Sequence, residues 1–226
     1  MSYYQKYLKY KNKYLNLKKM IGGETELVKA IEEKNIDKIL GILKKNPELA
    51  KVKNVLEGMP LYIAIDNDLP IEIIDALLDA CPNATKEINL RVLPIHLALV
   101  KNASFDVVKS LLKAYPEGAK VKGLNELLPI HFALKYKASY EIIEELLIVY
   151  PEGAKEFTLD RMLPIHYALY YKAPYKVIQK LLEVYPGGIH IKDSNGLLPM
   201  QIANSHGVSP RIIGLLSLYE IGTSSS

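Results

Sequence analysis

Three seven-residue strings carry the strongest structural signal in this chain: LPIHLAL at 93–99, LPIHFAL at 128–134 and LPIHYAL at 163–169. Looser copies extend the series on both sides, MPLYIAI at 59–65 and LPMQIAN at 198–204. The five prolines are 34, 35, 35 and 35 residues apart. Self-similarity at a fixed period of this length is typical of repeat architectures. We therefore expect one small unit to recur along the chain.

A second apolar pattern follows each proline at a constant distance. Two pairs of aliphatic side chains come 13, 14, 17 and 18 residues later, for example Ile142, Ile143, Leu146 and Leu147. This stripe predicts a helix with one buried side. Each unit is therefore predicted to hold two short antiparallel helices. The first begins at the proline, where a missing N–H is harmless. The Tyr-Pro-Glu-Gly sequences at 115–118 and 150–153 end the second helix with a breaker and a glycine.

Degenerate units are expected at both ends of the series. Ala30 matches Ala64 when the register is projected backwards, and polar residues interrupt the stripe at Lys44 and Ser217. Polar substitutions of this kind are expected of terminal capping repeats. The predicted fold class is all-α, a solenoid of six stacked helix-turn-helix units over residues 24–220, with a flexible tail at 221–226.

Composition favours a folded protein in a reducing compartment. Hydrophobic residues make up 49% and charged residues 24% of the 226 residues, which suffices for a buried core. The sequence lacks an apolar run long enough for a membrane span or a secretory signal, so we expect neither membrane insertion nor secretion. The single cysteine, Cys81, has no partner for a disulfide or a cysteine-based zinc site.

The first 23 residues form a separate basic segment. They hold six lysines and no acid, a charge of +6, whereas the whole chain carries +4, so the remainder carries −2. Five of the sixteen tyrosines also fall here. Tyr3, Tyr7, Tyr10 and Tyr14 are spaced by four and three residues, which predicts a short basic helix with an aromatic seam.

The repeated motifs resemble ankyrin repeats. The resemblance rests on the Leu-Pro-Ile-His-x-Ala-Leu strings, the paired hydrophobics of the second helices and the Asp193-x-x-Gly196 turn before Leu198-Pro199. It covers about residues 24–220, although each unit is roughly two residues longer than the usual 33 and leucine replaces the usual threonine before the proline. It implies a non-enzymatic protein-interaction scaffold, expected to be monomeric.

The resemblance also implies where a partner binds. Ankyrin proteins use the concave side, at the ends of the first helices and the tips of the connecting loops. Here those positions include Arg91, Lys101, Lys135, Tyr136, Arg161, Tyr170 and Tyr171. Tyrosine and arginine are enriched at binding hot spots. The alternative interpretation is an ordinary solvated face.

His96, His131 and His166 recur at intervals of 35 residues and invite a metal-site interpretation. Stacked helices place equivalent atoms roughly 8–10 Å apart, too far for ligands that each lie about 2 Å from one zinc ion. By resemblance to ankyrin repeats, these histidines are structural and tie neighbouring loops together. The sequence has no phosphate-binding loop, HExxH or nucleophile elbow, so we predict no enzymatic activity, metal or cofactor.

The segment YYQKYLKYKNKYLNLKKMIGG, residues 3–23, resembles the N-terminal segment of otherwise unrelated proteins of mimivirus-group giant viruses. This resemblance implies a viral protein that engages a host or viral partner in the host cytoplasm, the viral factory or the virion. Two alternatives stay open: binding of nucleic acid or an anionic surface through the basic segment, and a structural role in the virion.

The end of the basic segment is a candidate processing site. Met20-Ile21-Gly22-Gly23 resembles the sites cut by virion-maturation cysteine proteases of the adenovirus type. Two consecutive glycines form an open segment that fits a narrow protease groove. The alternative for Gly22 and Gly23 is a simple hinge before Thr25, which is suited to cap the first helix of the array.

Overall fold

The computed structural model describes residues 25–54, 58–89 and 91–223. The basic segment 1–23 and its Gly22-Gly23 site lie outside the described residues, so the expectations for them stay predictions. Unit 1 extends to Tyr115 and unit 2 begins at Pro116. The two units are described separately below.

All regular secondary structure in the described residues is helical. Unit 1 contains α2 (Glu26–Glu32), α3 (Ile36–Lys45), η1 (Pro47–Lys51), α4 (Pro60–Asp66), α5 (Ile71–Ala80), η2 (Pro82–Lys86), α6 (Pro94–Val100) and α7 (Phe105–Ala114). Unit 2 contains η3 (Pro116–Lys120), η4 (Leu124–Glu126), α8 (Pro129–Lys135), α9 (Tyr140–Val149), η5 (Pro151–Lys155), α10 (Pro164–Tyr170), α11 (Tyr175–Val184), η6 (Pro186–His190), α12 (Pro199–His206) and α13 (Pro210–Thr223).

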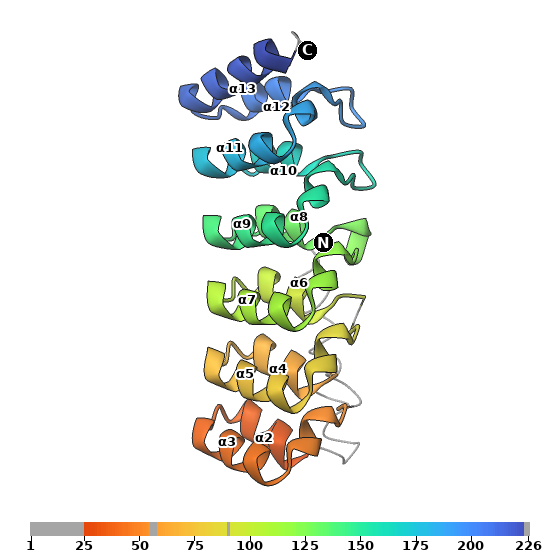
Figure 1. The fold of residues 1–226 in the computed structure, drawn as a ribbon, viewed down its shortest axis with the longest axis vertical. Coiled ribbons are helices and arrows are strands. Elements are labelled where there is room, and N and C mark those ends of the chain that lie inside the picture. The colour runs from red at the N-terminus through yellow and green to blue at the C-terminus, as the bar shows by residue number, and fades with distance from the viewer. Residues whose placement is uncertain (1–24, 55–57, 90, 224–226) are drawn as a thin grey trace. The chain divides into compact units, whose positions relative to one another are not determined.

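The helices of each unit form two rows. In unit 1 the first helices α2, α4 and α6 lie side by side, and α3, α5 and α7 form the second row (Figure 1). In unit 2 the same pattern joins α8, α10 and α12 in one row and α9, α11 and α13 in the other. The predicted pair of antiparallel helices is confirmed in every repeat. Within the described residues, no helix is long and apolar enough to cross a membrane.

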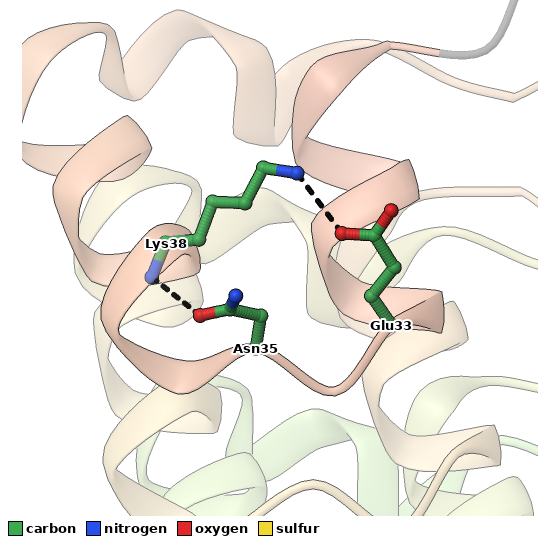
Figure 2. A network of polar contacts seen from close by, with 3 residues as sticks. All are labelled: Glu33, Asn35 and Lys38. Atoms are coloured by element: carbon green, nitrogen blue, oxygen red, sulfur yellow. Dashed lines mark hydrogen bonds and ion pairs between the residues drawn. The ribbon is translucent and has the colours of Figure 1, made fainter.

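The N-terminal repeat begins with well-formed caps. The Thr25 hydroxyl accepts a hydrogen bond from the N–H of Val28 at 3.2 Å, which confirms the predicted cap of α2. Asn35 caps α3 in the same way by accepting from the N–H of Lys38 at 3.1 Å. The Lys38 ammonium reaches back to Glu33 at 2.9 Å (Figure 2). These contacts fix the turn between the two helices.

The turn between the helices of each repeat is a Schellman motif. One residue enters the left-handed region, and the next N–H bonds to the carbonyl of the repeated alanine, as in Ala138 N–H to Ala133 O at 2.8 Å. The left-handed residues are Lys34, Asp68, Asn102, Lys137, Lys172 and Gly207. Five of these six are not glycine, although the left-handed region strains residues that have a Cβ.

The second helix ends at a corner residue, after which the chain continues as a five-residue 3-10 turn. This turn begins at a proline, as in η5 after Tyr150. The sequence predicted a helix stop and a plain loop here, and the stop is confirmed. The glycine of the corner has a packing role, because a Cβ on Gly153 would lie 3.1 Å from the Tyr150 ring.

The last helix differs from expectation. Helix α13 continues to Thr223, so residues 221–223, which we expected in the tail, are helical. Its outer surface exposes Leu218 and Ile221, each 70% exposed. The glycine at 222 and the short polar end favoured a tail. Once a helix has formed, however, it can extend through such residues, because each added residue gains one backbone hydrogen bond.

Burial of the predicted aliphatic stripe leads to a stability prediction. Leu146 is 3% exposed, whereas Ile148 on the same helix α9 is 62% exposed. Leu146→Ala should lower the free energy of unfolding by about 2–5 kcal/mol because it opens a cavity. Ile148→Ala should change it by less than about 0.5 kcal/mol. Urea unfolding of both variants measures the difference, and equal losses would contradict the stripe.

The Schellman turns give a second prediction. Lys137→Gly should raise the free energy of unfolding by about 0.5–1 kcal/mol because it relieves left-handed strain. Gly207→Lys should lower it by a similar amount at the equivalent position. Since a Cβ on Gly207 meets nothing within 4 Å, this loss is conformational and not steric. If both variants changed the free energy of unfolding in the same direction, the left-handed conformation of the turn would not be the cause of the change.

Candidate partner-binding surface

Four of the first helices are fixed at their N-termini by a side chain of their own first turn. In three repeats the backbone N–H of the residue before the helical proline donates to a buried side chain three residues later, namely to Nδ1 of His96, His131 and His166 at 3.1, 3.2 and 2.9 Å. In the last repeat Gln201 Oε1 takes this role at 2.8 Å. All three histidines are 0% exposed. This contact satisfies a backbone donor that the helix leaves unpaired.

The same histidines are held neutral. Because Nδ1 accepts a hydrogen bond, the ring proton lies on Nε2. In His166 this Nε2 lies 3.0 Å from the carbonyl oxygen of Ile191 in the following loop. Burial lowers the pKa of His131 from 6.5 to about 3, partly opposed by the backbone carbonyl of Glu156. Burial likewise lowers the pKa of His166, again with a backbone carbonyl opposing it.

Aromatic side chains gather at the C-terminal ends of the first helices in unit 2. We call Tyr136, Tyr170, Tyr171 and His206 the aromatic row. Tyr136, Tyr171 and His206 are 35 residues apart and occupy equivalent positions of three successive repeats. Tyr170 precedes Tyr171 and is 49% exposed. The row therefore runs across all three repeats of unit 2.

Ring contacts join three members of the aromatic row, namely Tyr170, Tyr171 and His206. The ring centroids of Tyr170 and Tyr171 are 5.1 Å apart, and those of Tyr170 and His206 are 4.6 Å apart. Tyr171 also packs on Tyr167 of its own helix at 5.7 Å. Tyr167 in turn meets the buried ring of His131 edge-on at 5.2 Å. The buried cap His131 is thus linked through Tyr167 to Tyr171.

Burial favours the neutral form of three phenols in this region, those of Tyr136, Tyr167 and Tyr171. Burial raises the pKa of Tyr136 and of Tyr171, and a neighbouring tyrosine in each case adds to the effect. Burial raises the pKa of Tyr167 to about 12, helped by Tyr171 and by Asp160. Neutral rings present flat apolar faces with one hydroxyl each, a combination that is enriched at protein interfaces.

Cationic side chains flank the aromatic row. The Lys135 ammonium lies 5.8 Å from the Tyr136 ring centroid. Lys137 and Lys172 are exposed at the neighbouring helix-helix turns. The surface formed by the row and these three lysines is therefore both aromatic and positive.

Unit 1 has different chemistry at the equivalent positions. Lys101 stands where unit 2 has Tyr136 and Tyr171, and its ammonium lies 3.7 Å from carboxylate oxygens of both Asp66 and Asp68. The Lys101 side chain is only 17% exposed. This lysine, expected at the binding surface, is therefore engaged within unit 1, where it links two repeats.

The two arginines expected at the surface lie at loop tips in a strained conformation. Arg91 and Arg161 have φ of 68° and 52°, and Glu126 between them in the register has 58°. The last repeat places Gly196 at the same position with φ of 76°. A residue with a Cβ costs about 1–2 kcal/mol there. Strained backbone conformations of this kind cluster at functional sites in proteins, which makes these loop tips candidate binding positions.

The tip around Arg161 also exposes apolar side chains. The backbone N–H of Thr158 donates to the carbonyl of Met162 at 3.1 Å, and the Met162 N–H returns to the Thr158 hydroxyl at 3.2 Å. This closed turn projects Phe157 and Leu159, which are 40% and 70% exposed. The Arg161 guanidinium lies 5.8 Å from the Phe157 ring. We call Phe157, Leu159 and Arg161 the Arg161 tip.

The sequence identified Arg161 but missed the two apolar side chains beside it. A usable signal was present, since Phe157 and Leu159 are apolar residues within a segment assigned to a loop. The residues that the structure describes contain no group of three His, Cys, Asp or Glu side chains able to hold a metal ion.

Comparison with known proteins identifies the fold. No protein-family model matches the sequence, and no curated protein matches it significantly. A chain from the structure of the predatory endopeptidase Bd0816 of Bdellovibrio bacteriovorus in complex with immunity protein Bd3460 matches with a TM-score of 0.65. The two sequences are 18% identical, and the match covers 87% of this chain and 98% of that chain.

The ankyrin repeat domain of Bcl-3, a member of the IkappaB protein family, matches with a TM-score of 0.61 at 17% identity, over 87% of this chain and 100% of that chain. The fold is the ankyrin-repeat fold. The predicted class, an all-α ankyrin-repeat solenoid, is thereby confirmed. At these identities the likeness establishes the fold alone. In ankyrin terms, the aromatic row lies at the ends of the first helices and the Arg161 tip lies in a connecting loop.

The neutral histidine caps lead to a pH prediction. Between pH 6.5 and about 3 the unfolded chain binds a proton at His131 and the folded chain does not, so the free energy of unfolding falls as pH falls. His131→Gln keeps a side-chain acceptor, as Gln201 shows, but cannot titrate. Between pH 7.5 and 5.0 the variant should lose about 2 kcal/mol less stability than the original chain. Urea unfolding at both pH values measures this, and parallel losses would contradict a neutral buried cap.

Proposed function

We propose that this protein is a non-enzymatic interaction module that binds a protein partner through the aromatic row and the Arg161 tip of unit 2. The observation that carries the proposal is the row itself: Tyr136, Tyr171 and His206 occupy equivalent helix ends in three successive repeats, and Tyr170 packs against both Tyr171 and His206. Aromatic side chains give large contact area with little entropy loss, and arginine adds directional hydrogen bonds.

The positive charge around the aromatic row indicates what kind of partner would fit it. Lys135, Lys137 and Lys172 flank the rings, and Arg161 stands at the loop tip. A partner that presents acidic side chains around an apolar centre complements this pattern, since cations at the rim speed association and fix orientation. Among the described residues of unit 1, the position equivalent to Tyr136 carries Lys101, whose charge is neutralised by Asp66 and Asp68.

The structural neighbours support this proposal. The chain that matches from the Bdellovibrio structure comes from a complex of two proteins. The Bcl-3 match is itself an ankyrin repeat domain. Both likenesses agree with a scaffold that presents a binding surface.

A narrower proposal concerns origin and place of action. The resemblance of residues 3–23 to giant-virus segments supports a viral protein that engages a host or viral partner in the host cytoplasm, the viral factory or the virion. We also propose that residues 24–220 act as one ankyrin domain behind a separate basic segment. Binding of nucleic acid or an anionic surface through that segment, and a structural role in the virion, are the competing functions.

Partner capture from host or infected cells tests the surface. Tyr170→Ala and the pair Tyr136→Ala with Tyr171→Ala should each weaken binding by roughly 30-fold or more, the effect of losing a hot-spot ring. Ile148→Ala removes an exposed apolar side chain from helix α9 and should leave capture unchanged. If the tyrosine variants bind the partner normally, the aromatic row is not the binding surface. A steep loss of capture with added salt would favour the nucleic-acid alternative instead.

A further inference from the structure

The corners of the repeats share a lysine-over-tyrosine contact. The lysine at the end of one 3-10 turn lies over the tyrosine ring that ends the second helix of the next repeat. The distances from ammonium to ring centroid are 5.6 Å for Lys86 and Tyr115, 5.7 Å for Lys120 and Tyr150, and 5.9 Å for Lys155 and Tyr185. A cation over a ring face at this range is attracted by the ring quadrupole.

The Cys81 corner of unit 1 lacks a ring. Cys81 occupies the position of Tyr115, Tyr150 and Tyr185, and Lys51 occupies the position of the covering lysine. A surface cavity of about 520 Å³ opens there, within the size range of ligand pockets. Its lining consists of Lys51, Lys53, Met59, Ala80, Cys81, Pro82, Asn83 and Glu87.

The polar frame around the cavity matches the frame around Tyr150. At the filled corner, Lys122 pairs with Glu156 at 3.3 Å, and the Tyr150 hydroxyl lies 3.5 Å from the same carboxylate. At the open corner, Lys53 pairs with Glu87 in the equivalent positions. The cavity thus keeps a cation for a ring face and an acceptor for a hydroxyl, and only the ring between them is missing.

A second difference accompanies the missing ring. At the filled corners the third residue after the tyrosine is glycine, and a Cβ there would lie 3.1 Å from the ring at both Gly153 and Gly188. The open corner has Ala84 at that position. A tyrosine at 81, held by its own Cα, would press against the Ala84 methyl. A ring that enters from outside is not tethered and can shift by the few tenths of an ångström required.

The cavity wall is also suited to an aromatic guest. Met59 stands where the four later repeats have leucine. Its thioether is flexible and makes favourable contacts with ring edges. Met59 is 6% exposed and Cys81 is 7% exposed, so both form an apolar floor beneath the charged frame.

We propose that the Cys81 cavity binds the side chain of a tyrosine supplied by a protein partner. The repeats themselves define the guest, because a polypeptide-borne phenol fills the same frame at Tyr150. Lys51 would cover the ring face, and Glu87 would accept the hydroxyl hydrogen bond. The inference does not depend on the aromatic row, since none of the cavity residues belongs to that surface.

The test uses the full-length chain and p-cresol, which is the tyrosine side chain without a backbone. Cys81 is the single cysteine, so its reaction rate with a disulfide reagent reports on the cavity alone. Saturating p-cresol should slow this reaction at least threefold, with a Kd of about 1–10 mM, as expected for so small a ligand. Toluene, which lacks the hydroxyl, should bind more weakly. Unchanged labelling throughout this concentration range would overturn the proposal.

Matched variants establish where the probe binds. Cys81→Tyr with Ala84→Gly rebuilds the filled corner and should abolish p-cresol shifts in amide NMR spectra. Tyr150→Cys with Gly153→Ala opens the equivalent corner in unit 2 and should create a second set of shifts there. Glu87→Gln should weaken binding of p-cresol but not of toluene. Equal p-cresol binding by the chain and its filled variant would overturn the assignment.

The source of the tyrosine is tested in the same chain. A full-length variant with Tyr3, Tyr4, Tyr7, Tyr10 and Tyr14 all changed to serine removes the tyrosines of the basic segment. If a partner supplies the ring, Cys81 should react at the same rate in this variant. Faster reaction would show that the chain's own segment fills the cavity and would overturn a partner as the source.

Discussion

Burial of the aliphatic stripe between neighbouring repeats is the interaction on which the rest of each unit depends. A single pair of helices has too little interior to fold alone, so its stripe is buried only when the next repeat packs against it. Helices α9 and α11 show the result, because Leu146 and Leu181 are only 3% and 2% exposed. Every other feature, from the histidine caps to the exposed rings, is placed by this packing.

This packing constraint determines which positions of a repeat are fixed in character and which can vary. Positions that face the neighbouring repeat are occupied by aliphatic residues, and in four repeats the residue before the helical proline is held by a buried histidine or by the exposed Gln201. Positions at the helix ends and loop tips contribute little to packing and so differ between the repeats. In unit 2 they became aromatic, as at Tyr136 and Tyr171, whereas in unit 1 Lys101 joined a pair of carboxylates.

Much of the fold was predictable because its determinants are local and repeated. The 35-residue register gave the helix pairs, the prolines gave the helix starts, and Thr25 was recognised as a cap from its residue type. What the sequence did not reveal depends on contacts between distant residues. The pairing of Lys101 with Asp66 joins residues of two repeats, and the corner glycines are explained only by the ring that lies against Gly153. The residue type at Arg161 does not indicate its backbone strain, since arginine is not a residue that predicts a left-handed turn; only the equivalent Gly196 marks the position.

The left-handed turns between the helices leave the surface charge adjustable. Lysine, aspartate and asparagine all occupy this one backbone position, at Lys34, Asp68 and Asn102. The backbone there is held by hydrogen bonds to the repeated alanine, so the side chain points outward and takes no part in the core. A change of residue at such a turn alters the local net charge by one unit or more, and with it the electrostatic potential, while the helices on either side stay in place. The array can therefore be retuned toward partners of either sign, one repeat at a time, without a new fold.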